Sequence, residues 1–269
     1  MNRKCSISLC LGFAALLGSS VMAVAQPLSS FAVLAGSAVT NTNPTIVTGN
    51  LGVSPGSAVT GFPPGIVAGG TIHSADPVAA QAQNELTTLY NSLANTTCNT
   101  DLTGQNLGGM TLTPGVYCFS TSAQLTGTLT LDAQGNPNAT FLFKIGSTLT
   151  TASTSSVLLI NSASSCGVFW QVGSSATLGT GTALAGSIVA LTSITLNSGA
   201  SVTGRALARN GAVTLDNNQV TVCSGGPGFP PPPVTVPVVT VPTLSGWGMI
   251  LLTGLLVLFG LATVRRLRV

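Results

Sequence analysis

Residues 167–222 of this 269-residue chain form three successive lines of one pattern. The lines are GVFWQVGSSATLGTGTALA (167–185), GSIVALTSITLNSGASVT (186–203) and GRALARNGAVTLDNNQVT (204–221). Each line opens on a glycine and carries a Thr-Leu pair at the equivalent place, starting at Thr177, Thr195 and Thr214. Short β-type runs that recur at such a period are typical of stacked copies of one small unit. The stretch therefore predicts a mainly β chain, folded as a β-solenoid with one line per coil.

The composition agrees with stacked strands. Hydrophobic residues make up 45% of the chain, charged residues 5% and aromatic residues 5%. This balance excludes a disordered chain and predicts an aliphatic core. Between residues 26 and 264 the cations are Lys144, Arg205 and Arg209, and the anions are Asp76, Glu85, Asp101, Asp132 and Asp216. Three minus five gives a charge of −2, so no basic patch for nucleic acid is expected.

The N-terminus has the pattern of a secretory signal peptide at residues 1–25. Arg3 and Lys4 precede an apolar run at 9–17, and Ala23-Val-Ala25 is a small-residue cleavage site. The alternative is an uncleaved membrane anchor, although the run is short for a bilayer. We expect an exported chain whose folded domain covers residues 26–224.

A different organisation follows the repeats. Residues 225–242 are rich in proline and predict an extended linker. Residues 246–264 carry no charge and are followed by Arg265, Arg266 and Arg268. This pattern predicts a transmembrane helix with its C-terminal end in the cytoplasm. A buried core helix is the alternative interpretation.

One helix is expected within the domain, at about residues 76–96. Asp76 is a suitable N-cap, and Pro77 suits the first turn. Apolar residues recur every three or four positions, at Val78, Ala82, Leu86, Leu89, Tyr90 and Leu93. This stripe should face the solenoid, along which the helix lies. Before the helix, GSAVT at 36–40 recurs at 56–60 and indicates another pair of coils.

Four cysteines remain after signal cleavage, and an even number in an exported chain predicts two disulfides. Proximity favours Cys98–Cys118, which leaves Cys166 with Cys223. These two bracket three coils, or about 14 Å at the usual strand spacing. The second bridge therefore requires the segment before Gly167, or the tail after Thr221, to run along the stack.

Motifs for catalysis or cofactor binding are missing from the sequence, which contains no P-loop, GxGxxG, GxSxG or CxxC pattern. His73 is the single histidine, so we expect it at the surface or at the helix cap. No metal site, cofactor or enzyme activity is predicted. A sugar-active enzyme would need two of the scattered carboxylates to converge.

The outward side chains of the coils are the remaining candidate site. Strand alternation directs Leu178, Ile194, Leu196, Val213 and Leu215 inward. The residues expected outward on an uncharged face are Thr40, Thr60, Thr148, Thr150, Ser175, Thr177, Ser193, Thr195, Ala212 and Thr214. Thr and Ser are also common on any exposed strand, so this face has an ordinary structural interpretation as well.

Several of these motifs resemble the microbial ice-binding protein family. They are FWQVGSSATLG at 169–179, LTSITL at 191–196, GRALARNGAVTL at 204–215, LTPGVY at 112–117 and FAVLAGSAVTNT at 31–42. The resemblance covers about residues 28–222. It implies a discontinuous right-handed β-solenoid with one flanking helix, and a flat face that binds ice or ordered water. Ser and Ala are expected to interrupt the rows of Thr.

The C-terminal sequence VPTLSGWG at 241–248, before the apolar segment and the arginines, resembles the IPTL-CTERM sorting signal. Pro242, Thr243, Leu244 and Trp247 carry the likeness, and Val241 stands where Ile is usual. It implies an exosortase-like processing enzyme as a partner and an envelope, surface or secreted destination. A structural or adhesive surface protein without ice activity is the alternative function.

Overall fold

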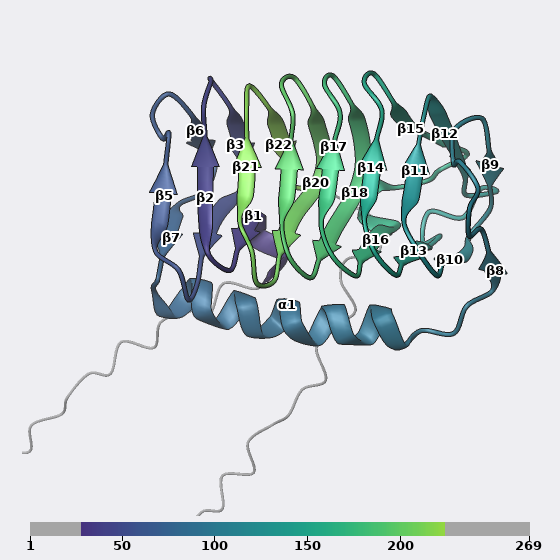
Figure 1. Ribbon diagram of the computed structural model, residues 1–269, viewed down its shortest axis with the longest axis horizontal. Coiled ribbons are helices and arrows are strands. Elements are labelled where there is room, and N and C mark those ends of the chain that lie inside the picture. The colour runs from purple at the N-terminus through teal and green to yellow at the C-terminus, as the bar shows by residue number, and fades with distance from the viewer. Residues whose placement is uncertain (1–27, 224–269) are drawn as a thin grey trace, which may run out of the picture. The chain divides into compact units, whose positions relative to one another are not determined.

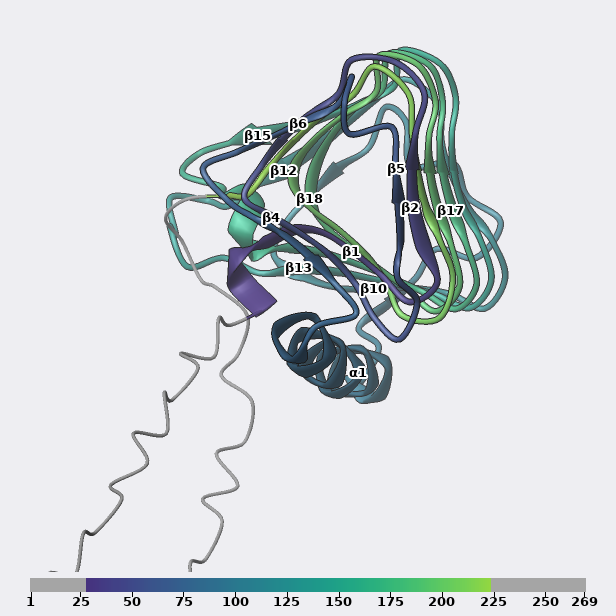
Figure 2. The same cartoon turned by 90° about the vertical axis from the view of Figure 1, so that its left-hand side faces the viewer.

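The computed structural model of the protein describes residues 28–223, which lie within the first of two compact units, Met1–Pro232 and Pro233–Val269. Over these residues the chain forms coils of parallel strands with a roughly triangular cross-section (Figure 2). Two sheets of seven and fifteen strands make up three faces. The predicted mainly β fold of stacked coils is confirmed.

The first face is the seven-stranded sheet, in front in Figure 1. Its strands in spatial order are β11 (Ala123–Leu125), β14 (Leu149–Thr151), β17 (Ala176–Leu178), β19 (Ile194–Leu196), β21 (Val213–Leu215), β2 (Ala38–Asn41) and β5 (Ala58–Thr60). All neighbouring pairs are parallel.

The fifteen-stranded sheet bends over the other two faces. The rear face holds β9 (Thr111–Leu112), β12 (Thr128–Asp132), β15 (Ser156–Ile160), β22 (Gln219–Thr221), β3 (Ile46–Thr48), β6 (Ile66–Ala68) and the first halves of β18 (Ala183–Ala190) and β20 (Ser201–Ala208). The helix-covered face holds β8 (Thr100–Asp101), β10 (Gly115–Phe119), β13 (Phe141–Ile145), β16 (Val168–Val172), β1 (Phe31–Ala35), β4 (Asn50–Val53), β7 (Ile72–Ser74) and the second halves of β18 and β20.

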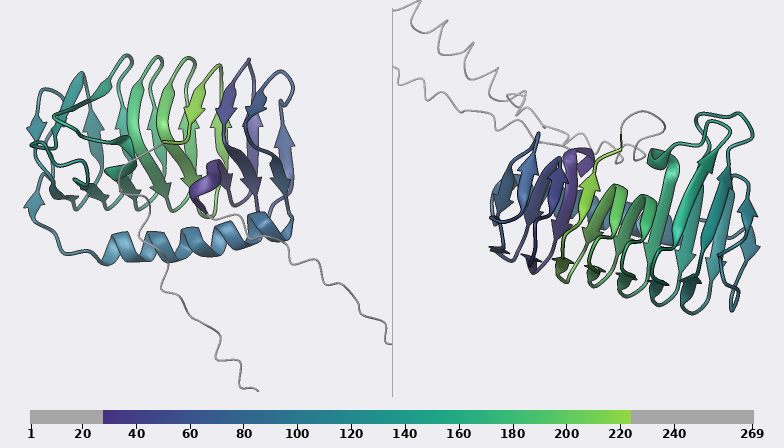
Figure 3. Two further views of the ribbon diagram at one scale, coloured as in Figure 1. Left: turned by 180° about the vertical axis from the view of Figure 1, so that it is seen from behind. Right: turned by 90° about the horizontal axis from the view of Figure 1, so that it is seen from above.

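The order of coils in space differs from their order in the chain. The first coil stacks on the last one, because β1, β2 and β3 pair with β20, β21 and β22. Helix α1 (Pro77–Asn95) then runs the length of the stack and returns the chain to the opposite end at β8 (Figure 1). Seen from behind, the helix still lies beneath the stack (Figure 3, left). The solenoid is therefore interrupted by its helix, as the sequence predicted.

A pair of stacked glycines makes the corner between the rear and helix-covered faces. Gly186 and Gly204 lie side by side, with φ of 112° and 149°. A Cβ on Gly204 would lie 2.1 Å from the carbonyl oxygen of Gly186, so no other residue fits there. The opening glycine of the first line, Gly167, is one position out of register, because Phe169 pairs with Ser187.

The core between the faces is aliphatic along most of its length, as predicted. At the β8 end the prediction of an aliphatic core is wrong, because three aromatic rings stack there. Tyr117, Phe143 and Trp170 are in register on three neighbouring strands. The rings of Phe143 and Trp170 lie 4.1 Å apart at an interplanar angle of 9°, and all three side chains are buried. In-register stacking places these few aromatic residues on one another, so their contacts favour the order of the coils.

Helix α1 begins and packs as the sequence predicts. Asp76 is its N-cap and accepts a hydrogen bond from Ala79 N at 2.8 Å. The apolar stripe of the helix packs on outward residues of the solenoid. These partners include Leu34, Leu142, Phe169, Val189 and Leu207. The helix thus covers one face and leaves the other two free of it (Figure 2).

Both expected disulfides are present, Cys98–Cys118 and Cys166–Cys223, with Cα atoms 6.0 and 5.4 Å apart. The short helix η2 (Ser165–Gly167) contacts β18 and β20, so the segment before β16 runs along the stack and reaches Cys223. The first helical turn of the domain, η1 (Leu28–Ser30), lies beside the same region, where Arg205 Nη2 donates to Ser29 O at 2.8 Å.

The predicted signal peptide (1–25), linker (225–242), transmembrane helix (246–264) and sorting residues Pro242, Thr243, Leu244 and Trp247 lie outside the described residues. Within residues 28–223, no helix is both long and apolar enough to cross a bilayer.

Candidate functional site

The seven-stranded sheet carries an uninterrupted row of threonines on its outer surface. Strand register places these residues side by side in the order Thr150, Thr177, Thr195, Thr214, Thr40 and Thr60. Five strand spacings separate the two ends of the row, or about 24 Å. We call this sheet surface the threonine face. The expectation that Ser and Ala interrupt the threonines is wrong for this row.

Ser and Ala, with one Thr, form a second row beside the first, two residues earlier along the chain in each coil. Its members are Ser122, Thr148, Ser175, Ser193, Ala212, Ala38 and Ala58. Hydroxyl groups in this row are tied to one another and to the backbone. Ser122 Oγ and Thr148 Oγ1 lie 2.8 Å apart, and Ser175 Oγ accepts from Ser193 N at 3.3 Å. These bonds limit the rotamers of the row and keep the surface regular.

The ten predicted face residues therefore all lie on the threonine face, in two adjacent rows. No charged side chain occurs in either row, and the inward partners Leu178, Ile194 and Val213 are buried. Five of the six threonines lie on strands that are hydrogen-bonded to a neighbouring strand on both sides, and Thr60 lies on the edge strand β5. The surface is therefore rigid before any ligand arrives.

Four positions of this face were not predicted. Gln124 continues the threonine row beyond Thr150, while Ser122, Ala38 and Ala58 extend the second row. No sequence motif marks Gln124 as a residue of this face. Its position follows only from the pairing of Gln124 with Thr150.

His73 lies on β7, close to the start of helix α1, and takes part in a chain of polar side-chain contacts. Its Nε2 lies 2.9 Å from Thr71 Oγ1, and its Nδ1 lies 2.7 Å from Asp76 Oδ2. Burial opposes ionisation of Asp76, but hydrogen bonds from Ala79 N and His73 outweigh it and lower the pKa of that carboxyl. Because the other oxygen of Asp76 caps helix α1, this chain holds the start of the helix. This placement agrees with the predicted role of His73 at the helix cap.

Comparisons with known proteins agree with this geometry. The family model described as ice-binding-like matches residues 33–221, and the IPTL-CTERM motif matches residues 241–266. A relative from Nostoc sp. (strain HG1), called an ice-binding protein, is 56% identical over 225 residues. The match covers 82% of this chain and 83% of that relative.

Solved structures share the fold. An ice-binding protein from an Antarctic biological consortium has a TM-score of 0.71 and 43% identity, covering 82% of this chain and 97% of its own. One from the Antarctic ascomycete Antarctomyces psychrotrophicus also has a TM-score of 0.71, with 39% identity over 74% of this chain and 97% of its own. The stacked coils, the flanking helix and the family match over residues 33–221 together place this chain in the ice-binding-like family.

Proposed function

We propose that this chain is an exported protein that adsorbs to ice through the threonine face and so inhibits ice growth or recrystallisation. The observation that carries the proposal is the uninterrupted row from Thr150 to Thr60, on a rigid sheet without charged side chains. The relatives named as ice-binding proteins support the same function.

The chemistry of threonine suits an ordered-water ligand. Its hydroxyl group forms hydrogen bonds with water, while its methyl group offers an apolar surface around which water reorganises. In the threonine row one hydroxyl group and one methyl group recur on every strand, at a spacing of about 4.8 Å. Water held in a regular pattern over the face can join the lattice of an adjacent crystal.

Each contact between the threonine face and ice is weak, but the face is rigid and makes many such contacts at once, so the protein adsorbs firmly. The threonines are fixed on a hydrogen-bonded sheet, so little conformational entropy is lost when water orders over them. Many contacts form or break together across about 24 Å of surface. A crystal that cannot easily displace the protein must grow between adsorbed molecules, where its curved front is less stable.

The other two faces of the coils are less suited to this role. Helix α1 covers one of them along the outward residues Leu34, Val189 and Leu207. The rear face exposes large apolar side chains at separate places, with Ile66 59% and Leu158 51% exposed. A regular plane of small groups is therefore found on the threonine face.

We further infer that the C-terminal segment directs the protein to the cell envelope. The IPTL-CTERM match at 241–266 supports recognition by an exosortase-like enzyme. Residues 246–264 have the composition of a membrane-spanning helix, which this enzyme would remove or retain. The domain is then displayed at the surface through the proline-rich residues 225–242, or is secreted after processing.

The test is a measurement of thermal hysteresis and ice recrystallisation with residues 26–226 at micromolar concentration. We expect faceted ice crystals, a measurable hysteresis gap and slower recrystallisation than in buffer. Unchanged crystal shape and growth would refute the proposal. A change in cell attachment after gene deletion would then favour the adhesive alternative.

A further inference from the structure

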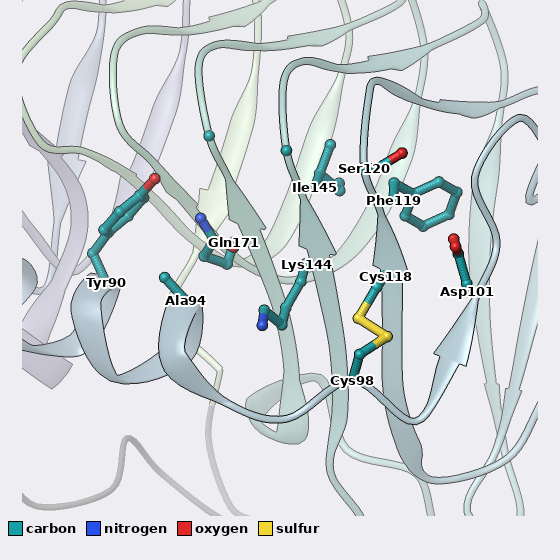
Figure 4. Close-up of a pocket in the computed structure, with 12 residues that line it drawn as sticks. Tyr90, Ala94, Cys98, Asp101, Cys118, Phe119, Ser120, Lys144, Ile145 and Gln171 are labelled. Carbon is teal, nitrogen blue, oxygen red and sulfur yellow. A yellow bond between two sulfur atoms is a disulfide. The ribbon is translucent and has the colours of Figure 1, made fainter.

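A groove with a mixed polar and apolar lining opens on the helix-covered face, at the point where helix α1 ends (Figure 4). Its volume is about 540 Å³, within the range of sites that take small organic ligands. The groove lies on a different face from the threonine rows, and no part of the proposed ice contact uses it.

Strand register explains why the groove lies there. One outward row runs across the helix-covered face, in the order Leu34, Leu207, Val189, Gln171, Lys144, Cys118 and Asp101. Helix α1 covers the three apolar members, Leu34, Leu207 and Val189. From Gln171 onward the row is polar and borders the groove, and the helix ends beside Lys144, which donates to Thr96 O. The half of the row that carries hydrogen-bonding groups therefore lines the groove, from the buried Gln171 to the exposed Asp101.

Gln171 is the most informative residue of the groove. Its side chain is 5% exposed, and its amide makes no hydrogen bond with any other residue between 28 and 223. Figure 4 places it between Tyr90 and Lys144. Because its amide atoms are not among the fully buried unpaired atoms of residues 28–223, they reach the groove, where water or a ligand can form hydrogen bonds with them. An apolar residue at position 171 would continue the apolar row of Leu34, Leu207 and Val189, so a glutamine is not required for packing there.

Lys144 and Asp101 supply opposite charges on either side of the Cys98–Cys118 disulfide. The Lys144 ammonium donates to the helix-end carbonyl of Thr96 at 2.5 Å, which fixes its position and leaves two of its three hydrogens for a ligand. The side chain and backbone of Thr103 donate to one oxygen of Asp101 and lower the pKa of that carboxyl, which stays ionised. Its second oxygen can accept hydrogen bonds from hydroxyl groups.

We propose that this groove binds a short acidic saccharide, with a sugar carboxylate on Lys144 and sugar hydroxyl groups on Gln171, Ser120 and Asp101. A charged lysine donor favours a carboxylate, while an amide, a hydroxyl and a carboxylate acceptor together favour a ligand rich in hydroxyl groups. Ala94 and Ile145 offer apolar surface to the C–H groups of a sugar ring.

The length of the polar row sets the size of the ligand. Asp101 lies two strands from Lys144, and Gln171 lies one strand beyond on the other side. At about 4.8 Å per strand, Asp101 is roughly 10 Å from Lys144 and roughly 14 Å from Gln171. A ligand that reaches both Asp101 and Gln171 is longer than one sugar ring, so the proposal is for two or more linked units.

The test uses the purified full-length chain in a detergent without a sugar headgroup, titrated with digalacturonate in a calorimeter. The matched probe is the dimethyl ester of the same disaccharide, which keeps the hydroxyl groups and removes the charge. We expect saturable binding of the acid and at least about tenfold weaker binding of the ester. The dipeptide glycylglycine tests a zwitterionic ligand. Its binding in place of the acid would overturn the proposal, as would the absence of binding by all three probes.

Variants distinguish this groove from other surfaces. Gln171→Leu and Lys144→Met should each weaken digalacturonate binding at least about tenfold, while Thr195→Tyr on the threonine face should leave it unchanged. Asp101→Asn, an exposed and conservative change, gives a second measurement if Lys144→Met fails to fold. Binding that survives in folded Gln171→Leu and Asp101→Asn would refute the assignment. Ice activity should be unaffected by all three groove variants, so failure of one proposal does not imply failure of the other.

Discussion

Thr40 and Thr214 are 174 residues apart in the chain, yet they lie side by side on β2 and β21, and Thr40 Oγ1 donates to Thr214 Oγ1 at 3.4 Å. This contact marks the junction between the first coils of the chain and its last ones. Because the strands on both sides keep the same register, the threonine row crosses the junction without a break. Two coils that precede the helix in sequence thereby enlarge a surface built mostly by residues that follow it.

Tyrosine in the centre of the threonine row should abolish close contact with ice. Thr195→Tyr or Thr214→Tyr adds a ring that rises above the plane, so we expect most of the thermal hysteresis to be lost. Both side chains point outward, and the free energy of unfolding should change by less than about 0.5 kcal/mol. Thr203→Tyr, on an exposed rear-face position of β20, is the matched control and should retain activity. A large loss of stability in the first two variants would show that their side chains do not face outward.

Lengthening the row should strengthen the activity. Gln124 occupies the position next to Thr150 at one end of the row, so Gln124→Thr would extend the threonines over seven strands. We expect larger thermal hysteresis at equal concentration and unchanged or slightly higher stability, because threonine suits a strand. Gln219→Thr makes the same change on the rear face and should have no effect on hysteresis. Equal gains from both variants would contradict a specific role for the row.

The two disulfides should differ in their contribution to stability. Cys166–Cys223 closes a separation of 57 residues and Cys98–Cys118 one of 20. Loop-closure entropy predicts losses of about 4 and 3 kcal/mol when each pair is replaced by serine. Urea unfolding of the two double-serine variants measures the difference. Because Cys223 also accepts a hydrogen bond from Arg205 Nη1 at 3.1 Å, a smaller loss for the longer bridge would be unexpected.

Asp76 should make the stability of the domain depend on pH. Its pKa is lower in the folded state, so its ionised form contributes stability above the unfolded value of about 3.9, and this contribution is lost as the pH falls through the folded value. Asp76→Ala should cost about 1 kcal/mol at pH 7, through loss of the cap of α1. Urea unfolding at pH 7 and pH 2 checks this expectation. A difference between the two proteins that is as large at pH 2 as at pH 7 would show that charge plays no part.

The sequence alone determined the features that depend on near neighbours. The period of residues 167–222 indicated coils, alternation indicated that Leu196 faces inward and Thr195 outward, and Asp76-Pro77 indicated where the helix begins. Each of these follows from backbone geometry or local hydrogen bonding over a few residues. The number and spacing of the cysteines indicated the two pairs, and the pair Cys166–Cys223 also required the segment before Gly167 or the tail after Thr221 to run along the stack.

Tertiary structure decided which coils are neighbours, and with that the surfaces. Nothing in the local pattern placed Thr40 against Thr214, gathered Tyr117, Phe143 and Trp170 into one stack, or aligned Gln171 with Lys144 and Asp101 near the end of the helix. These neighbours are set by hydrogen bonding and burial between whole coils, and any coil of this repeat could stack on several others. The return of the chain along helix α1 selects one order, and the uninterrupted threonine row and the groove at the end of the helix both follow from it.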